Sequence, residues 1–268
     1  MSKLNDPDYL LNEQYQNAKK LNARIRLHVE FSINKYGWCL WVFDHFNLPK
    51  ICRILELGCG PGDLWLENIS RIPAGWEITL SDFSPGMIEQ ARQNLANQSH
   101  PFKFEIIDAQ SIPYEDRQFD AVIANHFLYH VPDRRKSLSE IHRVLKENGK
   151  FFCSTIGETH MQELPALIEK FDPEIETVFK SETYPFTLEN AKPQLREWFS
   201  KTEVDRYPDD LEITDADAIV DYILSSISMS MDNNRREALK RFMEQEMALN
   251  GRVIFVKKDS GIFKAWNL

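Results

Sequence analysis

The sequence predicts an α/β protein with a doubly wound, mostly parallel sheet. Between residues 51 and 156, short apolar runs alternate with segments whose apolar residues recur at helical spacing. A glycine-rich turn, Gly58-Cys59-Gly60-Pro61-Gly62, follows the first apolar run and precedes the first helical segment. Because strands separated by single helices need crossover connections, the strands are expected to run parallel, with helices on both faces of the sheet.

Five strands and three helices are expected in this region. The helices are expected over Asp63–Ser70, Pro85–Asn97 and Arg134–Leu145, the last of them ended by Gly149. The strands are expected over Ile51–Leu57, Trp76–Ser81, Phe102–Ile107, Phe119–Ala124 and Lys150–Ile156.

The first fifty residues are rich in helix formers and aromatic residues. Leu21, Ile25 and Val29 recur at four-residue intervals, which predicts one helix. Tyr36-Gly37-Trp38 interrupts this pattern, and Trp38–Phe46 resumes it. We therefore expect two helices that form an N-terminal extension over residues 1–50.

The alternation of strands and helices stops after residue 156. Residues 157–200 hold helix-like stretches at His160–Phe171 and Leu188–Phe199, around a stretch at Phe179–Phe186 that could be extended. We interpret residues 157–200 as a cap inserted over the carboxyl ends of the strands, where such sheets bind ligands. The rest of the core, residues 201–268, is expected to contain a strand broken by a proline, two helices and a final edge strand or hairpin: Glu203–Ile213 with Pro208, Asp215–Ser226, Asn233–Leu249, and Arg252–Val256 with Gly261–Trp266.

Composition and charge restrict the function. The chain has 268 residues and a formal net charge of −9. Because such a charge disfavours binding to phosphate backbones, no nucleic-acid partner is expected. No stretch approaches the roughly 20 apolar residues that cross a bilayer, and the first residues lack a signal peptide, so no membrane partner is expected. The cysteines show neither a Cys-x-x-Cys pair nor metal-ligand spacing, which indicates buried thiols in a reducing, cytoplasmic location and no metal site: Cys39, Cys52, Cys59 and Cys153.

Four consecutive strands of the predicted sheet end in polar residues. In chain order these are Glu56, Asp82, Asp108 and Asn125. The carboxyl ends of parallel strands share one edge of the sheet, so we expect these side chains to line one ligand site. Asp82, at the end of the second strand, can accept hydrogen bonds from both ribose hydroxyls of a nucleotide. The Gly-x-Gly-x-Gly spacing differs from the Gly-x-Gly-x-x-Gly of a dinucleotide site.

From Arg53 to Ile156 the sequence closely resembles the class I S-adenosylmethionine-dependent methyltransferases. Besides the glycine-rich turn and the polar strand ends, the segment from His142 to Lys150 looks like the segment that precedes the fifth strand in that family. The resemblance implies a Rossmann-like core with a seven-stranded, mostly parallel sheet, and S-adenosyl-L-methionine as cofactor. Leu21–His28 with Tyr36-Gly37-Trp38 resembles a lid found in some bacterial members, and Phe186–Tyr222 also looks like the corresponding region of such members.

The resemblance also implies contacts at the methionine end of the cofactor. That end would be held by Glu56, Gly58, Gly60 and Gly62, with Asn125 beside the methionine portion and the methyl group. Asp63 stands where a small polar residue is frequent, and two interpretations remain open. Its carboxylate either contacts the cofactor's ammonium group or favours a helix N-terminus electrostatically.

At the adenosine end, the resemblance assigns a role to each of five residues. Asp82 would accept the ribose hydroxyls, and Phe83 and Met87 would lie along the adenine ring. Asp108 would accept a hydrogen bond from the adenine amino group, and Ala109 would supply a backbone amide.

A hydroxyl or ammonium acceptor must lose a proton on methylation, so a nearby base helps. His126, directly after Asn125 at the strand rim, and His28, in the expected lid, are the candidate catalytic residues, whereas His130 is expected to stabilise its loop. A carboxylate or thiolate acceptor would need no base. Arg24 and Arg26 could recognise an acidic group or lie in solvent. The aromatic residues could wall an apolar acceptor pocket or pack in the core and lid: Tyr15, Tyr36, Trp38, Phe127, Tyr129, Tyr184 and Phe186.

The sequence therefore predicts a methyltransferase that acts on an O or N atom of a small-molecule acceptor, without a metal, by in-line transfer in a lidded pocket. A methyltransferase acting on RNA or protein is the alternative, which a basic or extended groove would favour. A nicotinamide-dependent oxidoreductase would share the fold, yet it would need the longer glycine spacing and would leave Glu56 unexplained. A non-catalytic protein on the same scaffold should lack a cofactor residue, and none is missing.

Overall fold

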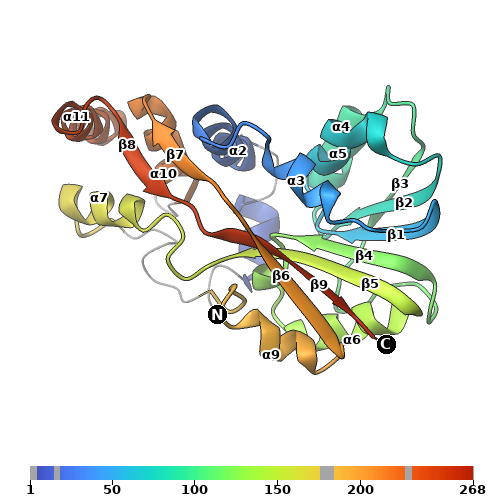
Figure 1. Ribbon diagram of the computed structural model, residues 1–268. Helices are drawn as coiled ribbons and strands as arrows, with labels where there is room; N and C mark the ends of the chain where they lie inside the picture. Colours follow the sequence, from blue (N-terminus) through green and yellow to red (C-terminus); the bar gives the residue numbers. More distant parts are fainter. Residues whose placement is uncertain (1–4, 15–18, 176–183, 227–230, 268) are drawn as a thin grey trace.

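The computed structural model describes residues 5–14, 19–175, 184–226 and 231–267. Its main sheet has seven strands in the order β3-β2-β1-β4-β5-β9-β6, and β9 is the one antiparallel member (Figure 1). This confirms the predicted doubly wound, mostly parallel sheet. The strands are β1 Ile51–Leu57, β2 Gly75–Asp82, β3 Phe102–Ile106, β4 Phe119–Asn125, β5 Leu145–Ile156, β6 Lys201–Tyr207 and β9 Ser260–Trp266.

Helices cover both faces of this sheet because alternate strand residues point to opposite sides. In β1, Leu55 and Leu57 belong to one buried apolar cluster, whereas Cys52 and Ile54 belong to another. The first cluster is covered by α6 (Arg134–Val144) and α9 (Ala191–Arg196), and the second by α3, α4 and α5, on the opposite face (Figure 1). The latter three span Trp38–Asp44, Asp63–Asn68 and Pro85–Leu95, and short 3-10 turns cover Ile69–Arg71 and Leu128–His130.

Local sequence fixes where the core helices begin. The Ser84 side chain accepts a hydrogen bond of 3.3 Å from the Met87 amide, and Pro85 follows at the first helical position of α5. The Asp133 side chain caps α6 in the same way, over 2.9 Å to the Lys136 amide. The helix expected to reach Leu145 ends one residue earlier, and Gly149 does not end it. Leu145 instead pairs with β4, so β5 starts five residues before the expected strand.

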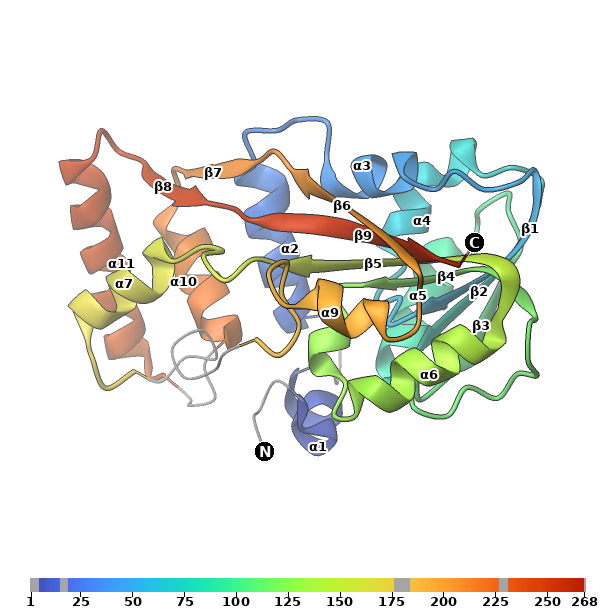
Figure 2. The same cartoon turned by 60° about the horizontal axis from the view of Figure 1, so that its bottom comes forward.

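A third apolar cluster lies beyond the main sheet. It is formed by elements that precede and follow the core, and they gather at one end of the molecule (Figures 1 and 2). The expected strand over residues 203–213 divides at Pro208 into β6 and β7, and the expected C-terminal pair becomes two strands in different sheets, because β8 pairs with β7. The elements are α2 Lys19–Phe31, α7 Glu163–Phe171, β7 Asp210–Ile213, α10 Ala216–Ser226, α11 Asn233–Leu249 and β8 Ile254–Lys257.

Polar contacts hold α2 against the later part of the chain. Nε of Arg24 donates to the Ser225 hydroxyl over 3.1 Å, and the Ser32 hydroxyl donates to Oδ1 of Asp209 over 2.7 Å. Before α2, a short helix, α1, spans Pro7–Tyr9 and a π-turn follows it. None of the helices in the described ranges has the length and apolar character needed to span a bilayer.

Candidate active site

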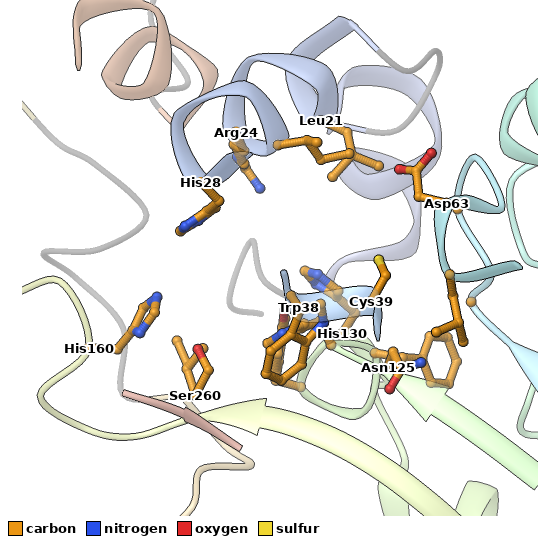
Figure 3. A pocket seen from close by; sticks show the side chains of 18 of the residues that line it. Leu21, Arg24, His28, Trp38, Cys39, Asp63, Asn125, His130, His160 and Ser260 are labelled. Atoms are coloured by element: carbon orange, nitrogen blue, oxygen red, sulfur yellow. The ribbon is translucent and has the colours of Figure 1, made fainter. Parts of the chain in front are cut away.

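A cavity of about 1070 Å³ lies between the carboxyl ends of the main strands and the elements around the third cluster, which we call the cap from here on. Pockets for one drug-sized ligand measure about 300–1000 Å³. Leu21, Arg24 and His28 point into this cavity from α2, and His160 and Ser260 face them from the other side (Figure 3). The expected apolar stripe of α2, which includes Ile25 and Val29, therefore faces the cavity, while Leu27 packs in the third cluster.

The glycine turn bends sharply at the end of β1. Gly58, Gly60 and Gly62 have positive φ angles of 72°, 54° and 84°. A Cβ atom at position 58 would lie 2.3 Å from the Phe127 ring, so only glycine fits there. Gly62 packs beneath the turn against Leu95 and does not line the cavity, whereas the other nine residues predicted to bind cofactor do.

Asp82 joins the glycine turn to the end of β2. Its Oδ2 accepts a hydrogen bond of 3.0 Å from the Gly60 amide, and its Oδ1 accepts one of 2.8 Å from the Ser84 amide. Burial raises the pKa of the Asp82 carboxyl to about 6, and these amide hydrogen bonds oppose that rise.

Glu56 lies below the turn and is 2% exposed. Its Oε2 accepts a hydrogen bond of 2.6 Å from the Trp65 indole nitrogen. Burial raises the pKa of Glu56 to about 7, opposed by the hydrogen bonds from Trp65 and Asn125. The Oδ1 atom of Asn125 is buried and finds no hydrogen-bond partner among the described residues. Burial also raises the pKa of Asp63, which points into the cavity from the first turn of α4 (Figure 3).

The residues predicted for the adenosine end also lie together. Oδ1 of Asp108 accepts hydrogen bonds from the backbone and side-chain nitrogens of Gln110, at 2.9 and 3.1 Å. Met87 and Ala109 are buried, whereas Phe83 is partly exposed. All of these residues line the same end of the cavity as Asp82.

Both predicted catalytic histidines line the cavity. The His126 backbone has a positive φ of 47°, and its ring lies 5.0 Å from that of Trp38. Burial, reinforced by the Lys258 ammonium, lowers the pKa of His126 to about 4. The pKa of His28 is lowered well below its ordinary value, chiefly by burial, and its Nδ1 has no partner in the described part of the chain. His130, expected to serve its loop, lines the cavity as well.

Sequence reasoning missed three side chains of the cap end, His160, Tyr222 and Lys258. They come from three separate segments, none of which carries a recognisable motif. The Lys258 ammonium lies 2.5 Å from Oδ2 of Asp209, and both side chains are buried. Burial lowers the pKa of His160 to about 3.

The remaining predicted residues divide between cavity and core. Arg24 lines the cavity, whereas Arg26 forms exposed ion pairs with Glu30 and Asp215. Phe186 is buried in the core. Tyr15 lies outside the described residues. The other aromatic candidates line the cavity: Tyr36, Trp38, Phe127, Tyr129 and Tyr184.

Residues 48–206, more than half of the chain, match the family model described as a methyltransferase domain. The chain belongs to this methyltransferase family. It is a class I, S-adenosylmethionine-dependent enzyme, as the sheet order and the predicted cofactor residues around the glycine turn indicate. The family match favours a methyltransferase over the nicotinamide-dependent oxidoreductase that would share the fold.

Curated relatives of the methyltransferase cover the core. A ubiquinone/menaquinone biosynthesis C-methyltransferase, UbiE, of Geobacter sp. (strain M21) is 36% identical over 115 residues, which are 42% of this chain and 49% of the relative. A demethylmenaquinone methyltransferase of Staphylococcus aureus (strain JH9) is 32% identical over 159 residues, 59% of this chain and 63% of the relative. The methyltransferase thus spans about half to three fifths of the length of these relatives.

Solved structures share the fold of the methyltransferase. The YcgJ protein of Bacillus subtilis superposes with a TM-score of 0.58 at 18% identity, covering 85% of this chain and 97% of that one. Phosphoethanolamine N-methyltransferase 2 of Haemonchus contortus, in complex with S-adenosyl-L-methionine, gives a TM-score of 0.61 at 19% identity. It covers 97% of this chain and 59% of that one.

Proposed function

We propose that this enzyme transfers the methyl group of S-adenosyl-L-methionine to an O or N atom of a small-molecule acceptor, held between the sheet and the cap. The observation that carries the proposal is one continuous cavity of about 1070 Å³, which joins the glycine turn to a group of histidine side chains. Because a pocket for one drug-sized molecule measures about 300–1000 Å³, the cofactor and a small acceptor fit together. The described cysteines are free thiols, which favours a reducing compartment such as the cytoplasm.

The cavity residues around the glycine turn are suited to bind the cofactor, which is a cationic nucleoside. Glu56 and Asp63 offer carboxylates to the ammonium group of the cofactor, and the buried Oδ1 of Asn125 offers a further acceptor. A carboxylate has about four acceptor sites, so Asp82 retains capacity for a ribose hydroxyl beside its hydrogen bonds to backbone amides. Phe83 and Met87 would flank the adenine, with Asp108 and Ala109 at its polar edge.

The bound cofactor supplies an electrophilic methyl group on a sulfonium. The chain's contribution is to hold an acceptor atom in line with that group, which can account for much of the rate. His126 and His28 are the proposed general bases, because their rings line the cavity and stay neutral at pH 7. Trp38 packs against His126 and supports the orientation of its ring.

A carbon atom is the second candidate for the methylated position. The names of the Geobacter and Staphylococcus relatives favour it, since the first is a C-methyltransferase of quinone biosynthesis and the second acts on demethylmenaquinone. A base near the acceptor serves both outcomes, because removing a proton from a hydroxyl activates the oxygen and the neighbouring ring carbons alike.

Calorimetric titration with S-adenosylmethionine and S-adenosylhomocysteine tests the cofactor site. We expect micromolar binding that weakens at least about tenfold in Asp82→Ala, since hydrogen bonds to charged groups contribute about 1.5–3 kcal/mol. Asp116→Ala, which removes an exposed carboxylate paired with Arg143, should bind normally. Failure of the wild-type protein to bind either ligand would refute the proposal.

The acceptor class is tested with a ¹³C-methyl-labelled cofactor and a cell extract separated into small molecules, RNA and protein. We expect the label in the small-molecule fraction, and the ¹³C chemical shift then identifies an O-, N- or C-methyl group. Label in RNA or protein would replace this proposal by the macromolecular alternative.

A further inference from the structure

The ionisable side chains of the cavity wall differ in kind between its two ends. At the glycine-turn end, its ionisable side chains are the carboxyls of Glu56, Asp63, Asp82 and Asp108, with the exposed Glu67 at the edge. At the cap end they are mainly basic: Arg24, His28, His126, His160 and Lys258. The acids at that end are Asp209, which is paired with Lys258, and Glu158, which is exposed. A cationic cofactor matches the first end, which leaves the second end, with its histidine side chains, Arg24 and Lys258, for the acceptor.

His28 and His160 approach one another across the cap end. His28 projects from α2, and His160 projects from the loop before α7, on the opposite wall (Figure 3). Their ring centroids lie 6.4 Å apart with an angle of 32° between the planes. One group on a ligand is therefore close enough to contact both rings. The Tyr222 ring lies beside this pair, with its centroid 6.1 Å from that of His28 and an angle of 84° between the planes.

The hydrogen bonds of the two rings show what they offer to a ligand. The Asp259 amide donates to Nδ1 of His160 over 2.9 Å, so the neutral ring carries its proton on Nε2. Nδ1 of His28 is buried without a partner in the described part of the chain. A buried polar nitrogen without a partner is costly, and an oxygen ligand would satisfy it.

Charges around the pair favour an anion over a neutral group. After burial, the Lys258 ammonium contributes to lowering the pKa of both His28 and His160. The same positive potential that disfavours an added proton attracts a negative charge. Hydrogen bonds from an imidazole to an ionised oxygen are also stronger than those to a neutral one.

We propose that His28 and His160 together donate hydrogen bonds to an anionic oxygen group of the acceptor, such as a carboxylate or an ionised enol or phenol, which leaves His126 as the general base. This inference rests on the proposed function, because it takes the cap end of the cavity as the acceptor site. It adds the class of acceptor: a small molecule with an acidic oxygen, whose charge complements the basic end while the cofactor occupies the acidic end.

A charge series of aromatic probes of equal shape tests this inference. Benzoate, benzamide and benzylammonium are titrated into the protein saturated with S-adenosylhomocysteine, and ¹H–¹³C NMR follows the imidazole signals. We expect benzoate to bind at least about tenfold more tightly than benzamide, with benzylammonium weakest. Benzoate should shift the signals of His28 and His160 but not those of His142, which lies outside the cavity and contacts Asn267.

Three variants test whether the preference for benzoate depends on His28 and His160. His28→Leu removes both ring nitrogens, and His160→Asn keeps an acceptor near the Asp259 amide while removing Nε2. Each should reduce the preference for benzoate to less than about threefold, with S-adenosylhomocysteine affinity within about twofold of the wild type. His142→Asn should keep the full preference.

The possible failures are distinguishable. Normal S-adenosylhomocysteine binding without a preference for benzoate, or with a preference that survives both variants, would overturn this inference alone. Benzoate binding that leaves both imidazole signals of the wild-type protein unmoved would do the same, even if a variant does not fold. Absence of S-adenosylhomocysteine binding to the wild type would instead remove the proposed function itself.

Discussion

The indole nitrogen of Trp65 donates a hydrogen bond of 2.6 Å to Oε2 of Glu56, directly beneath the glycine turn. Trp65 is fully buried in the core between the sheet and α4, so it fixes the carboxyl group from below. Because burial raises the pKa of this carboxyl to about 7, its protonation changes in the physiological range. Glu56 is therefore a buried carboxyl group whose ionised form would be favoured by a cation in the cavity.

Cofactor affinity should rise with pH as a result. A bound ammonium group favours the ionised form of Glu56, whose pKa is about 7, and hydrogen bonds from ribose hydroxyls favour that of Asp82, whose pKa is about 6. We expect S-adenosylhomocysteine affinity to increase between pH 6 and 8, by at most about tenfold per pH unit for each proton released. Calorimetry in two buffers of different ionisation enthalpy measures that release. Glu56→Gln keeps an acceptor for Trp65 and should remove most of the pH dependence, and an unchanged slope would contradict the assignment.

Substitutions at two glycines with similar backbone angles distinguish the cost of backbone strain from the cost of a steric clash. Gly58 and Gly251 have φ angles of 72° and 70°, but an added Cβ meets Phe127 only at position 58 and nothing within 4 Å at position 251. Gly251→Ala should lower the free energy of unfolding by about 1–2 kcal/mol, from backbone strain. Gly58→Ala should cost about 1–3 kcal/mol more, from overpacking, and weaken S-adenosylhomocysteine binding. Urea denaturation measures both, and equal costs would show that Phe127 moves away freely.

The proposed base can be replaced without altering the backbone. Asn tolerates positive φ angles better than most residues, so His126→Asn should fold with the same turn. We expect methyl transfer to the acceptor to slow by about 10²–10⁴, the usual contribution of general acid–base catalysis. Single-turnover kinetics gives this rate, and S-adenosylhomocysteine affinity should stay within about twofold. A variant as fast as the wild type would show that the acceptor reacts without His126.

The buried histidines should destabilise the fold in acid. The pKa of His126 is about 4 and that of His160 about 3, both below the ordinary 6.5, so the unfolded chain binds protons that the folded chain refuses. Their contribution is intact above pH 6.5 and falls as pH is lowered toward these values. The raised pKa values of Glu56 and Asp82 have the opposite effect on the free energy of unfolding. The wild type is therefore compared with a variant that keeps both carboxyl groups.

His160→Asn provides that comparison. Between pH 6.5 and 4.5, the wild type should lose about 2 kcal/mol more of its unfolding free energy than the variant does. Chemical denaturation at each pH measures the difference. Parallel curves for the two proteins would show that His160 titrates normally in the folded state.

The core and the cofactor end of the site could be predicted because their signals are local. Glu56, Asp82, Asp108 and Asn125 each lie at or just after the end of an apolar run, and a parallel sheet brings strand ends together whatever the rest of the chain does. The start of β5 was mispredicted because Leu145 still has helical spacing, and only its pairing with Phe119 places it in the sheet.

The cap end could not be predicted, since its residues meet through long-range packing. Lys258 reaches the cavity because β8 pairs with β7 rather than with β9, and Tyr222 does so because α10 packs against α2. His160 was visible only as one residue of an expected helix, and that helix begins three residues later. The hydrophobic periodicity of the sequence does not predict which of these elements pack together.

The carboxylate of Asp209 accepts hydrogen bonds from Ser32, which lies 177 positions earlier in the chain, and from the Asn34 amide, and it also pairs with Lys258. During synthesis, α2 therefore emerges from the ribosome long before the groups that anchor it. Strands β1 to β5 can pair as each is synthesised, whereas α2 waits for β7 and β8, and β6 waits for β9. We expect the nascent chain to expose Leu27 and Phe31 of α2, which the third cluster covers in the folded protein, so this helix is open to chaperone binding during that interval.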